Sequence, residues 1–411
     1  MRIVFVGGAS GGHFYPLMAV AEELSSRSPV PEMYYFGPSP YKKELLVSYK
    51  ITYVYCPAGK LRRYFSIQNF FDVFRSFFGV IVAVWKLYVI YPDVIFSKGS
   101  YTSVPILLAA RFLRIPVVIH ESDSRPGLAN KLARKFARYI GIAYDDVAQF
   151  FPPEKTALVG IPLRREIRTI TADPFTPLGI PNDLPLIYVT GGSQGAERIN
   201  NIVMRTLVDL LPHYRIFHQV GDDNVKELQL SAQTLLADSV LQNNYFIVGS
   251  VPGATVSLLL DAASLVITRA GSTTLFEIAA HNKPAIIIPI PEEVSHDQRS
   301  NAYAYARNGA ASVIEEKNIT PHLLTSEISS IINSPERYQA MASAAKAQSL
   351  PDAATKVADI LLSIGQEHAY KFCSYTFCSF TNRLHAYWWY SYCTFLISVR
   401  NATTGYFYTE N

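Results

Sequence analysis

Short apolar runs alternate with longer amphipathic stretches along most of this chain. An apolar run followed by a turn and a helical period is typical of a βα unit, and a series of such units predicts parallel sheets. In the first half, the predicted strands are Arg2–Val6, Met33–Phe36, Ile51–Tyr55, Val94–Phe96, Val117–His120 and Tyr139–Ile142. In the second half, they are Leu186–Thr190, Arg215–Gln219, Tyr245–Val248, Leu265–Thr268 and Ala285–Pro289. The pattern therefore predicts an α/β protein with two Rossmann-like halves.

A stretch without hydrophobic periodicity separates the two halves. It runs from Thr171 to Pro185, is rich in proline, and predicts an interdomain linker. With 411 residues, the chain is longer than one average domain. We expect domains over residues 1–163 and 164–340, followed by helices over 341–367 that pack back on the first domain.

Two glycine-rich loops follow predicted strands, at Gly7–His13 and Gly191–Ala196. Glycine lets the backbone approach a ligand closely, and the next helix N-terminus offers unpaired N–H groups to an anion. Neither loop is specific alone, because the first does not have the GxGxxG spacing of a dinucleotide fold. Together they predict ligand binding beyond the carboxyl ends of the strands.

Three more loops after strands carry polar residues that folding does not require: Ser97–Thr102, His120–Asn130 and Arg269–Thr274. In the last loop, we expect Ser272 and Thr273 to cap a helix whose free N–H groups face a pyrophosphate. Glu277 would lie one turn further on, within reach of ribose hydroxyls. The alternative is a plain capping motif followed by an exposed glutamate.

The motifs in these loops are arranged in the order of a known family. They are GGASGGHFYP at 7–16, KGSYTSVP at 98–105, HESDSRPGLANK at 120–131, VGIPLR at 159–164, GGSQGA at 191–196, RAGSTTLFEIA at 269–279 and DQRSNA at 297–302. As a set they resemble MurG, the bacterial family that transfers N-acetylglucosamine from its UDP donor to lipid I, giving lipid II in peptidoglycan synthesis. The resemblance implies a GT-B glycosyltransferase, with two Rossmann-like domains whose parallel sheets face a central cleft.

The resemblance also implies where each substrate binds. The first domain would handle undecaprenyl-linked lipid I, with Tyr101 and Asn130 as acceptor contacts, and the second would hold UDP-N-acetylglucosamine. Glu277 would contact the ribose and Gln298 the sugar. The implied donor-binding residues are Ser10, Gly11, Gly12, Asp123, Arg164, Ser193, Ser272, Thr273, Thr274, Glu277 and Gln298.

Forming a β-linked disaccharide from an α-linked sugar nucleotide inverts the anomeric carbon, so one in-line displacement suffices. The attacking C4 hydroxyl loses its proton, and a base with a pKa near neutrality suits that step. We predict His13 as this base, the alternative being a histidine that only packs against the helix start. Glu121 is a second candidate base, equally suited to orienting a neighbour. His120 is as consistent with a hydrogen-bonded structural histidine at a strand end as with a functional residue.

The departing UDP needs stabilisation of its developing charge. Helix N-terminal N–H groups supply it without a metal, and Arg164 adds a cation. The sequence has no Asp-x-Asp pair in a loop after a strand. We therefore expect neither a required metal ion nor a cofactor.

Two positions depart from the family pattern. Ser10 stands where the family commonly has Thr, which keeps the hydroxyl. Ser122 and Asp123 stand where it has Gln-Asn, and an ionised Asp123 accepts hydrogen bonds but cannot donate them. The turn between Tyr245 and Leu265 is longer than in the family, so no uracil contact is assigned there.

A formal net charge of +4 does not by itself indicate nucleic acid, and we expect none as a partner. Basic and aromatic residues are interleaved over residues 60–86, which fits either a surface that lies on an anionic bilayer or a buried helix with a basic flank. Arg75 and Lys86 bracket an uncharged run that we expect to be too short to span a membrane. Because no secretory signal precedes the first strand, we expect a peripheral protein on the cytoplasmic face of the cell membrane.

Residues 368–411 have a different composition, rich in aromatic residues and cysteine, and no counterpart in the family. A membrane-surface appendage and a non-native extension are the alternatives, and the second is favoured. The fold is expected to end with a helix near Asp352–Ile364. None of the four cysteines has metal-ligand spacing.

Two other functions fit the same architecture. A UDP-N-acetylglucosamine 2-epimerase would need carboxylates around the sugar ring and no lipid surface, so the 60–86 stretch favours the transferase. The other is a non-catalytic UDP-sugar-binding module. Unchanged transfer by His13→Ala, with UDP-sugar binding kept, would support this module or shift the base to Glu121.

Overall fold

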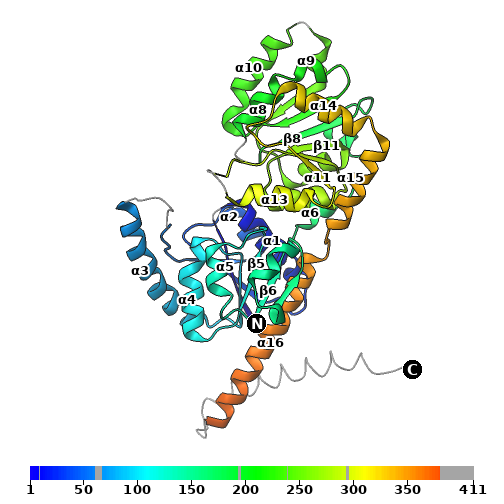
Figure 1. Cartoon of the computed structure of the whole chain (residues 1–411). Coiled ribbons are helices and arrows are strands. Elements are labelled where there is room, and N and C mark those ends of the chain that lie inside the picture. The colour runs from blue at the N-terminus through cyan, green and yellow to red at the C-terminus, as the bar shows by residue number, and fades with distance from the viewer. Residues whose placement is uncertain (9, 61–66, 193–195, 238, 293–295, 380–411) are drawn as a thin grey trace, which may run out of the picture.

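The computed structural model describes residues 1–379 except 9, 61–66, 193–195, 238 and 293–295. Two parallel sheets form its lower and upper halves in Figure 1. The first sheet has the order β3 (Thr52–Tyr55), β2 (Glu32–Gly37), β1 (Arg2–Val6), β4 (Val94–Ser97), β5 (Val117–Glu121), β6 (Tyr139–Ile142), β7 (Thr156–Leu158). The second has the order β10 (Tyr245–Val248), β9 (Arg215–Gln219), β8 (Leu186–Thr190), β11 (Ala263–Thr268), β12 (Ala285–Ile287), β13 (Ala311–Val313).

Both strand orders reverse direction after the first strand of their sheet. In each, the first strand is flanked on one side by the second strand and on the other by the fourth, which opens a crevice at their carboxyl ends. The crevice of the first sheet lies between β1 and β4, and that of the second between β8 and β11. The predicted glycine-rich loops leave β1 and β8, so both start at these crevices.

The predicted strands are confirmed, with ends that differ by at most two residues. The hydrophobic pattern predicted them because buried parallel strands are continuous apolar runs, as in the wholly buried β8. β7 and β13 were missed. Each has only three residues and is only partly buried, so neither produces a distinct apolar run.

Helices cover both sheets. Those of the first half are α1 (Gly11–Ser25), α2 (Lys43–Ser48), α3 (Ile67–Ile90), α4 (Val104–Leu113) and α5 (Leu128–Ala133). The second half has α8 (Glu197–Met204), α9 (Leu207–Leu210), α10 (Val225–Leu235), α11 (Gly253–Ala262), α12 (Ser272–Ala280), α13 (His296–Ala306), α14 (Pro321–Ile332) and α15 (Pro335–Gln348). Between the halves lie the short helices α6 (Arg165–Arg168) and α7 (Phe175–Leu178).

The expectation that residues 171–185 form an interdomain linker is wrong. Ile180 is buried in the core of the second sheet, and Phe175 and Leu178 of α7 pack against that core. The prolines interrupt helical periodicity, but the apolar residues between them still find a buried site. The chain instead crosses between the halves ahead of this stretch, around α6.

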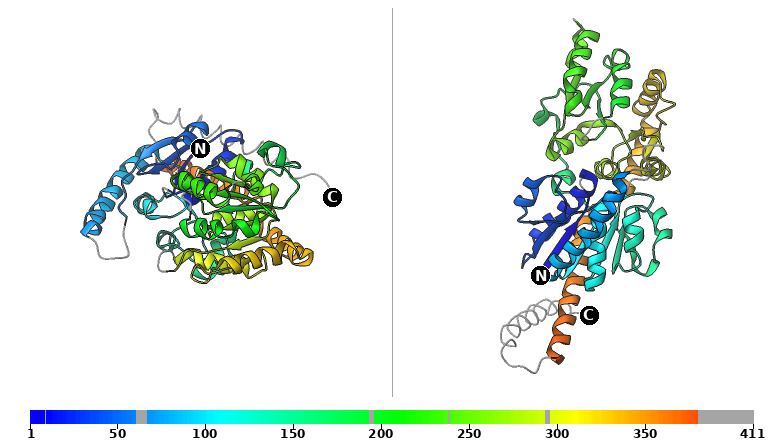
Figure 2. Two further views of the ribbon diagram at one scale, coloured as in Figure 1. Left: turned by 90° about the horizontal axis from the view of Figure 1, so that it is seen from above. Right: turned by 90° about the vertical axis from the view of Figure 1, so that its left-hand side faces the viewer.

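The final helix, α16 (Ala353–Ser379), returns to the first half and lies along it in Figures 1 and 2. Val357, Ala358 and Leu361 are buried in the same cluster as the apolar residues of α1. Two ion pairs at the surface, Arg27 with Asp359 and Arg138 with Glu367, also join α16 to the first half. The expected end of the fold near residue 364 is wrong, because the helix continues to Ser379. The rest of the cysteine-rich tail, including Cys393, lies outside the described residues.

Helix α3 is long, apolar and largely exposed. Its C-terminal half packs on the body through Ala83 and Leu87, and Ser76 Oγ accepts from the Gly59 N–H (3.1 Å), while its N-terminal end stands apart in Figure 1. Phe70–Ile90 is long and apolar enough to cross a membrane, with 17% of its most apolar window buried. The uncharged run of residues 76–84, on which the expectation rested, is shorter than a span, but Arg75 and Lys86 do not interrupt the helix, which as a whole is long enough. Arg62 and Arg63 lie outside the described residues.

Candidate active site

A cleft of about 1120 Å³ lies between the two sheets and is lined from both sides. The first half contributes the start of α1 and the loop after β5. The second half contributes the loop after β8, the start of α12 and part of α13. The predicted site residues that line it are Ser10, Gly11, Gly12, His13, Asp123, Arg164, Ser272, Thr273, Thr274, Glu277 and Gln298. Ser193 lies outside the described residues.

His13 lies in the first turn of α1 rather than on a loop. The helix begins at Gly11, and the carbonyl of Ser10 accepts hydrogen bonds from the backbone N–H groups of His13 (3.1 Å) and Phe14 (3.0 Å). The His13 Nδ1 atom is buried and has no hydrogen-bond partner among the described residues. Burial lowers the pKa of His13 from its usual value, the nearby Lys98 charge lowers it further, and Asp123 opposes both. A neutral imidazole with a free nitrogen is thus held at the cleft wall.

Glu121 is turned toward its own loop. Its carboxylate accepts from the backbone N–H groups of Asp123 (3.2 Å) and Gly127 (2.9 Å) and from Asn130 Nδ2 (2.9 Å). It is buried and is not among the described residues that line the cleft. Burial raises the pKa of Glu121 to about 7, and Asp123 raises it as well. The contacts indicate a residue that shapes the loop after β5.

Lys98 and His120 form a buried pair beneath this loop. His120 Nε2 lies 2.7 Å from the Gly160 carbonyl, which can only accept, so Nε2 carries the proton and Nδ1 accepts from Lys98 Nζ at 2.7 Å. Lys98 Nζ also donates to Ser122 Oγ. Burial lowers the pKa of His120 well below its usual value and that of Lys98 to about 8. His120 is therefore a fully paired histidine, as one of the two sequence interpretations had it.

The N-terminus of α12 faces α1 across the cleft. Its N-cap is Gly271, and no side chain of the described residues caps it, so the expected capping by Ser272 and Thr273 is wrong. Ser272 instead opens the helix and donates from Oγ to Asp123 Oδ1 (2.6 Å). A Cβ atom placed on Gly12 would lie 3.9 Å from Thr273 Oγ1, so the two helix starts approach closely. The first N–H groups of α12 thus stay available to an anion.

The remaining donor candidates surround this helix start. Burial raises the pKa of Glu277 to about 7, with the Arg164 charge opposing. Arg164 lies over the Tyr15 ring, 4.3 Å from its centroid, and pairs with Glu166. Gln298 Oε1 is buried without a hydrogen-bond partner in the part of the chain that the structure describes. Buried polar atoms without partners are costly, so this oxygen is suited to receive a ligand donor.

The two acceptor candidates lie away from the cleft lining. Asn130 is buried under the loop after β5, where it donates to Glu121 and to the His120 carbonyl (3.1 Å). Tyr101 is half-buried at the start of a short turn after β4. Neither is among the described residues that line the cleft. Their acceptor role stays a prediction.

Comparison with known proteins identifies the family to which this chain belongs. Residues 3–142 match the glycosyltransferase family 28 N-terminal domain, and residues 186–357 match the family 28 C-terminal domain. A Treponema denticola relative named UDP-N-acetylglucosamine--N-acetylmuramyl-(pentapeptide) pyrophosphoryl-undecaprenol N-acetylglucosamine transferase is 33% identical over 382 residues, covering 88% of this chain and 97% of the relative. A Shouchella clausii protein of the same name is 35% identical over 351 residues, covering 82% and 92%.

The chain belongs to the MurG family of glycosyltransferases. Its structure is similar to that of Acinetobacter baumannii MurG, with a TM-score of 0.70 and 24% identity over 88% of this chain and 99% of the other. A UDP-N-acetylglucosamine 2-epimerase from Neisseria meningitidis has a TM-score of 0.65 at 15% identity, over 88% and 100%. At these identities both comparisons show the fold alone, which confirms the predicted GT-B architecture.

Several cleft residues of this MurG family member were missed from the sequence. Val251, Pro252 and Val256 line the cleft just after β10, a position that could have signalled them. Asn301 was inside a quoted motif but was not singled out. Lys98 was also in a quoted motif, and only its burial beneath the cleft marks it as unusual. No group of three His, Cys, Asp or Glu that could hold a metal ion is found among the described residues.

Proposed function

We propose that this chain transfers N-acetylglucosamine from UDP-N-acetylglucosamine to the C4 hydroxyl of the N-acetylmuramyl group of lipid I, giving lipid II. The names of its relatives over most of the chain support these substrates. The observation that carries the proposal is the opposition across one cleft of His13 Nδ1 and the N-terminus of α12, neither of which has a side-chain partner among the described residues. In this arrangement His13 can accept the proton of the attacking hydroxyl, while the start of α12 binds the departing UDP.

The donor is proposed to bind mainly to the second half. The pyrophosphate would lie at the start of α12, with Thr273 and Thr274 beside it and Gly12 close opposite. Glu277 would accept from ribose hydroxyls, and Gln298 Oε1, which has no partner within the described part of the chain, would accept from a sugar hydroxyl. Ser10, Gly11 and Arg164 would complete the donor site from the other wall.

His13 is the proposed base and Glu121 a residue that orients the loop after β5. In the displacement, the C4 oxygen forms a bond to the anomeric carbon while the bond from that carbon to the UDP oxygen breaks. UDP leaves with the electron pair, and the C4 proton passes to His13. Glu121 already accepts three hydrogen bonds and is not on the cleft lining, which argues against its acting as the base.

The leaving group is proposed to be stabilised by the α12 N–H groups and Arg164 without a metal ion. The N–H groups donate hydrogen bonds and the guanidinium is positively charged, so both can stabilise the negative charge on UDP without a bound metal ion. A chelator such as EDTA is therefore expected to leave the rate of transfer unchanged. Loss of activity with EDTA, restored by a divalent cation, would contradict this.

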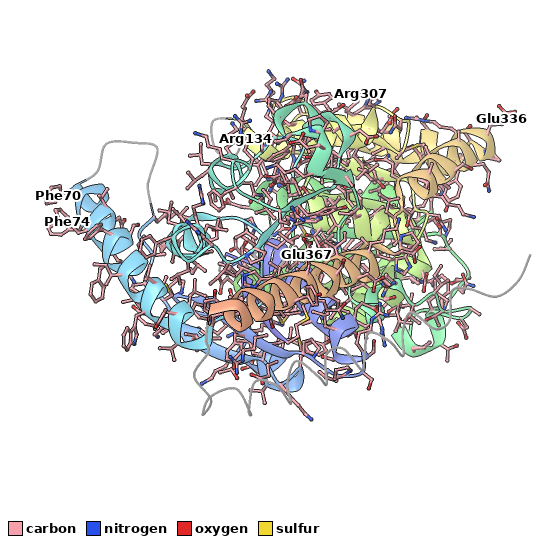
Figure 3. The ribbon with its side chains drawn as sticks, turned by 90° about the horizontal axis from the view of Figure 1, so that it is seen from below. Phe70, Phe74, Arg134, Arg307, Glu336 and Glu367 are labelled. Atoms are coloured by element: carbon pink, nitrogen blue, oxygen red, sulfur yellow. The ribbon has the colours of Figure 1, made fainter. Side chains whose placement is uncertain are left out.

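The protein is proposed to bind the cytoplasmic face of the membrane peripherally, with residues 1–163 facing the lipid-linked acceptor. The exposed apolar face of α3 supports this, since aromatic side chains partition into the bilayer interface. Lys86 donates to the Tyr55 carbonyl (2.6 Å), so its amine is partly engaged. Figure 3 shows Phe70 and Phe74 at the end of α3 that points away from the other elements.

The test is transfer from UDP-N-acetylglucosamine to a lipid I analogue, comparing wild type with His13→Ala. Loss of a general base is expected to lower kcat by about 10²- to 10⁴-fold, while UDP-sugar affinity is kept. His213→Ala, at an exposed histidine of the second half, is the matched control and should have no effect. Release of UDP into water without disaccharide by the wild type would overturn the proposal.

A further inference from the structure

A cluster of four polar residues joins the two halves beside the proposed donor site. Asp123 and Ser124 belong to the loop after β5, whereas Ser272 opens α12 and Asn301 lies on α13. All except Asp123 are buried. We call these four residues the interdomain clasp.

The clasp is held by hydrogen bonds in both directions. Asp123 Oδ1 accepts from Ser272 Oγ (2.6 Å) and from Asn301 Nδ2 (2.9 Å). Asn301 Oδ1 accepts from the backbone N–H of Ser124 (2.8 Å). Within the second half, Asn301 Nδ2 also lies 2.9 Å from Ser272 Oγ and 3.4 Å from the Ala270 carbonyl. Three bonds thus cross between the halves, and two of them end on one carboxylate oxygen.

An apolar contact lies next to the clasp. The rings of Tyr144 and Phe276, one from each half, meet edge to face at 5.5 Å in a buried cluster with Ile161 and Leu163. This cluster resists separation of the halves but fixes no register, because apolar contacts are non-directional. The clasp supplies direction, since its donors and acceptors match in only one arrangement of the two loops.

The clasp joins the two walls of the cleft between which the transfer is proposed to take place. Ser272 begins the helix proposed to hold the donor, and Asp123 lies on the loop that Glu121 shapes beside His13. We propose that Asp123 and Asn301 are positioning residues, which hold the base-bearing wall of the cleft in register with the donor-bearing wall. This inference rests on the proposed function for its kinetic consequence, but the clasp itself can be observed without any substrate.

The charge of Asp123 has a separate consequence. Its carboxylate lies at the helix start where a diphosphate is proposed to bind, so it repels the donor while it holds the clasp. An asparagine here would keep the accepting oxygen and remove the charge. Asp123→Asn should therefore keep the register and lower the KM for the UDP sugar, whereas Asp123→Ala should lose the register.

The first measurement is hydrogen exchange of the full-length protein without substrate, followed in a peptide that contains Ser124. The Ser124 amide is bonded to Asn301, so Asn301→Ala and Asp123→Ala should speed its exchange, and Asp123→Asn should leave it slow. Arg307→Ala removes a different contact between the halves, the exposed pair with Asp146, and is the matched control. Unchanged exchange in Asn301→Ala would overturn the proposal, whatever the activity.

The second measurement is the kinetics of disaccharide formation. Misplacing the two walls is expected to lower kcat by about 10- to 100-fold in Asp123→Ala and Asn301→Ala, with a smaller change in the donor KM. The double variant should lose no more than the worse single variant, because both remove one cluster. Additive losses, or a donor KM that rises while kcat is kept, would overturn the positioning role. If the wild type formed no disaccharide, the proposed function would fail while the exchange result still judged the clasp.

Discussion

At the scale of single residues, burial sets the protonation states around the cleft. Burial is the largest influence on the pKa of His13, Lys98, Glu121 and Glu277, and it favours the neutral form in every case. The imidazole of His13 is thereby kept unprotonated and ready to accept. The carboxyl of Glu121, with a pKa of about 7, would be only partly ionised at neutral pH.

These shifts make the identity of the base measurable from pH dependence. A base must be deprotonated to act, so kcat/KM falls as pH falls through the pKa of that base in the free enzyme. Because the pKa of His13 is lowered from 6.5, the acid limb of kcat/KM should lie below pH 6.5. Glu121→Gln should leave that limb in place. A limb near pH 7 that disappears in Glu121→Gln would assign the base to Glu121 instead.

Several residues that follow strands were correctly predicted to face the cleft, namely Ser10 to His13, Asp123, Ser272 to Thr274 and Glu277. Tyr101, Glu121 and Asn130 also follow strands but are not among the described residues that line it. The hydrogen bonds they make could not be predicted. Asp123 meets Ser272 and Asn301 across more than a hundred residues of sequence, and no local pattern encodes such a contact.

At the scale of elements, α3 is the clearest departure from an ordinary covering helix. Basic and aromatic residues are interleaved over residues 60–86, which left a buried helix and an interfacial one as alternatives. The exposed aromatic side chains, with Phe74 at 59% and Phe77 at 67%, favour the interfacial one. The sequence could not show this, because exposure depends on what the rest of the fold leaves uncovered.

Replacing Phe74, Phe77 and Phe78 by Ser should weaken binding to vesicles that contain anionic lipid. Each aromatic side chain contributes about 1.5 to 3 kcal/mol when fully removed from water, so the loss should be at least about tenfold. Leu230→Ser, at a comparably exposed position on α10, is the control and should bind normally. Co-sedimentation with vesicles measures both. Unchanged binding of the triple variant would contradict the membrane role of α3.

At the scale of the whole molecule, the two halves are joined by more than the clasp. The His281 ring is buried between Asp261 Oδ1 and the Ile167 carbonyl, at 2.6 Å from each. Asp261 also accepts from the backbone N–H of Thr171 (2.7 Å). This network fastens the crossing segment to the second half. The proline-rich composition suggested a loose linker there, because composition does not reveal hydrogen bonds to distant residues.

Asp261→Ala should therefore destabilise the protein strongly. It leaves the buried His281 Nδ1 and the Thr171 N–H unpaired, and each buried polar group left without its partner costs about 1 to 3 kcal/mol. Asp359→Ala, which breaks the exposed pair with Arg27, should cost less than about 1 kcal/mol. Urea unfolding of both variants compares the two free energies. Equal stability of the two variants would contradict this account of the crossing segment.

The central claim is inverting transfer across a cleft built from both halves. The most direct measurement follows the reaction of UDP-N-acetylglucosamine with a lipid I analogue and determines the anomeric configuration of the product by NMR. The account predicts a β-linked disaccharide formed in equal amount to the UDP released. An α-linked product, or UDP released with only free or epimerised sugar, would contradict it.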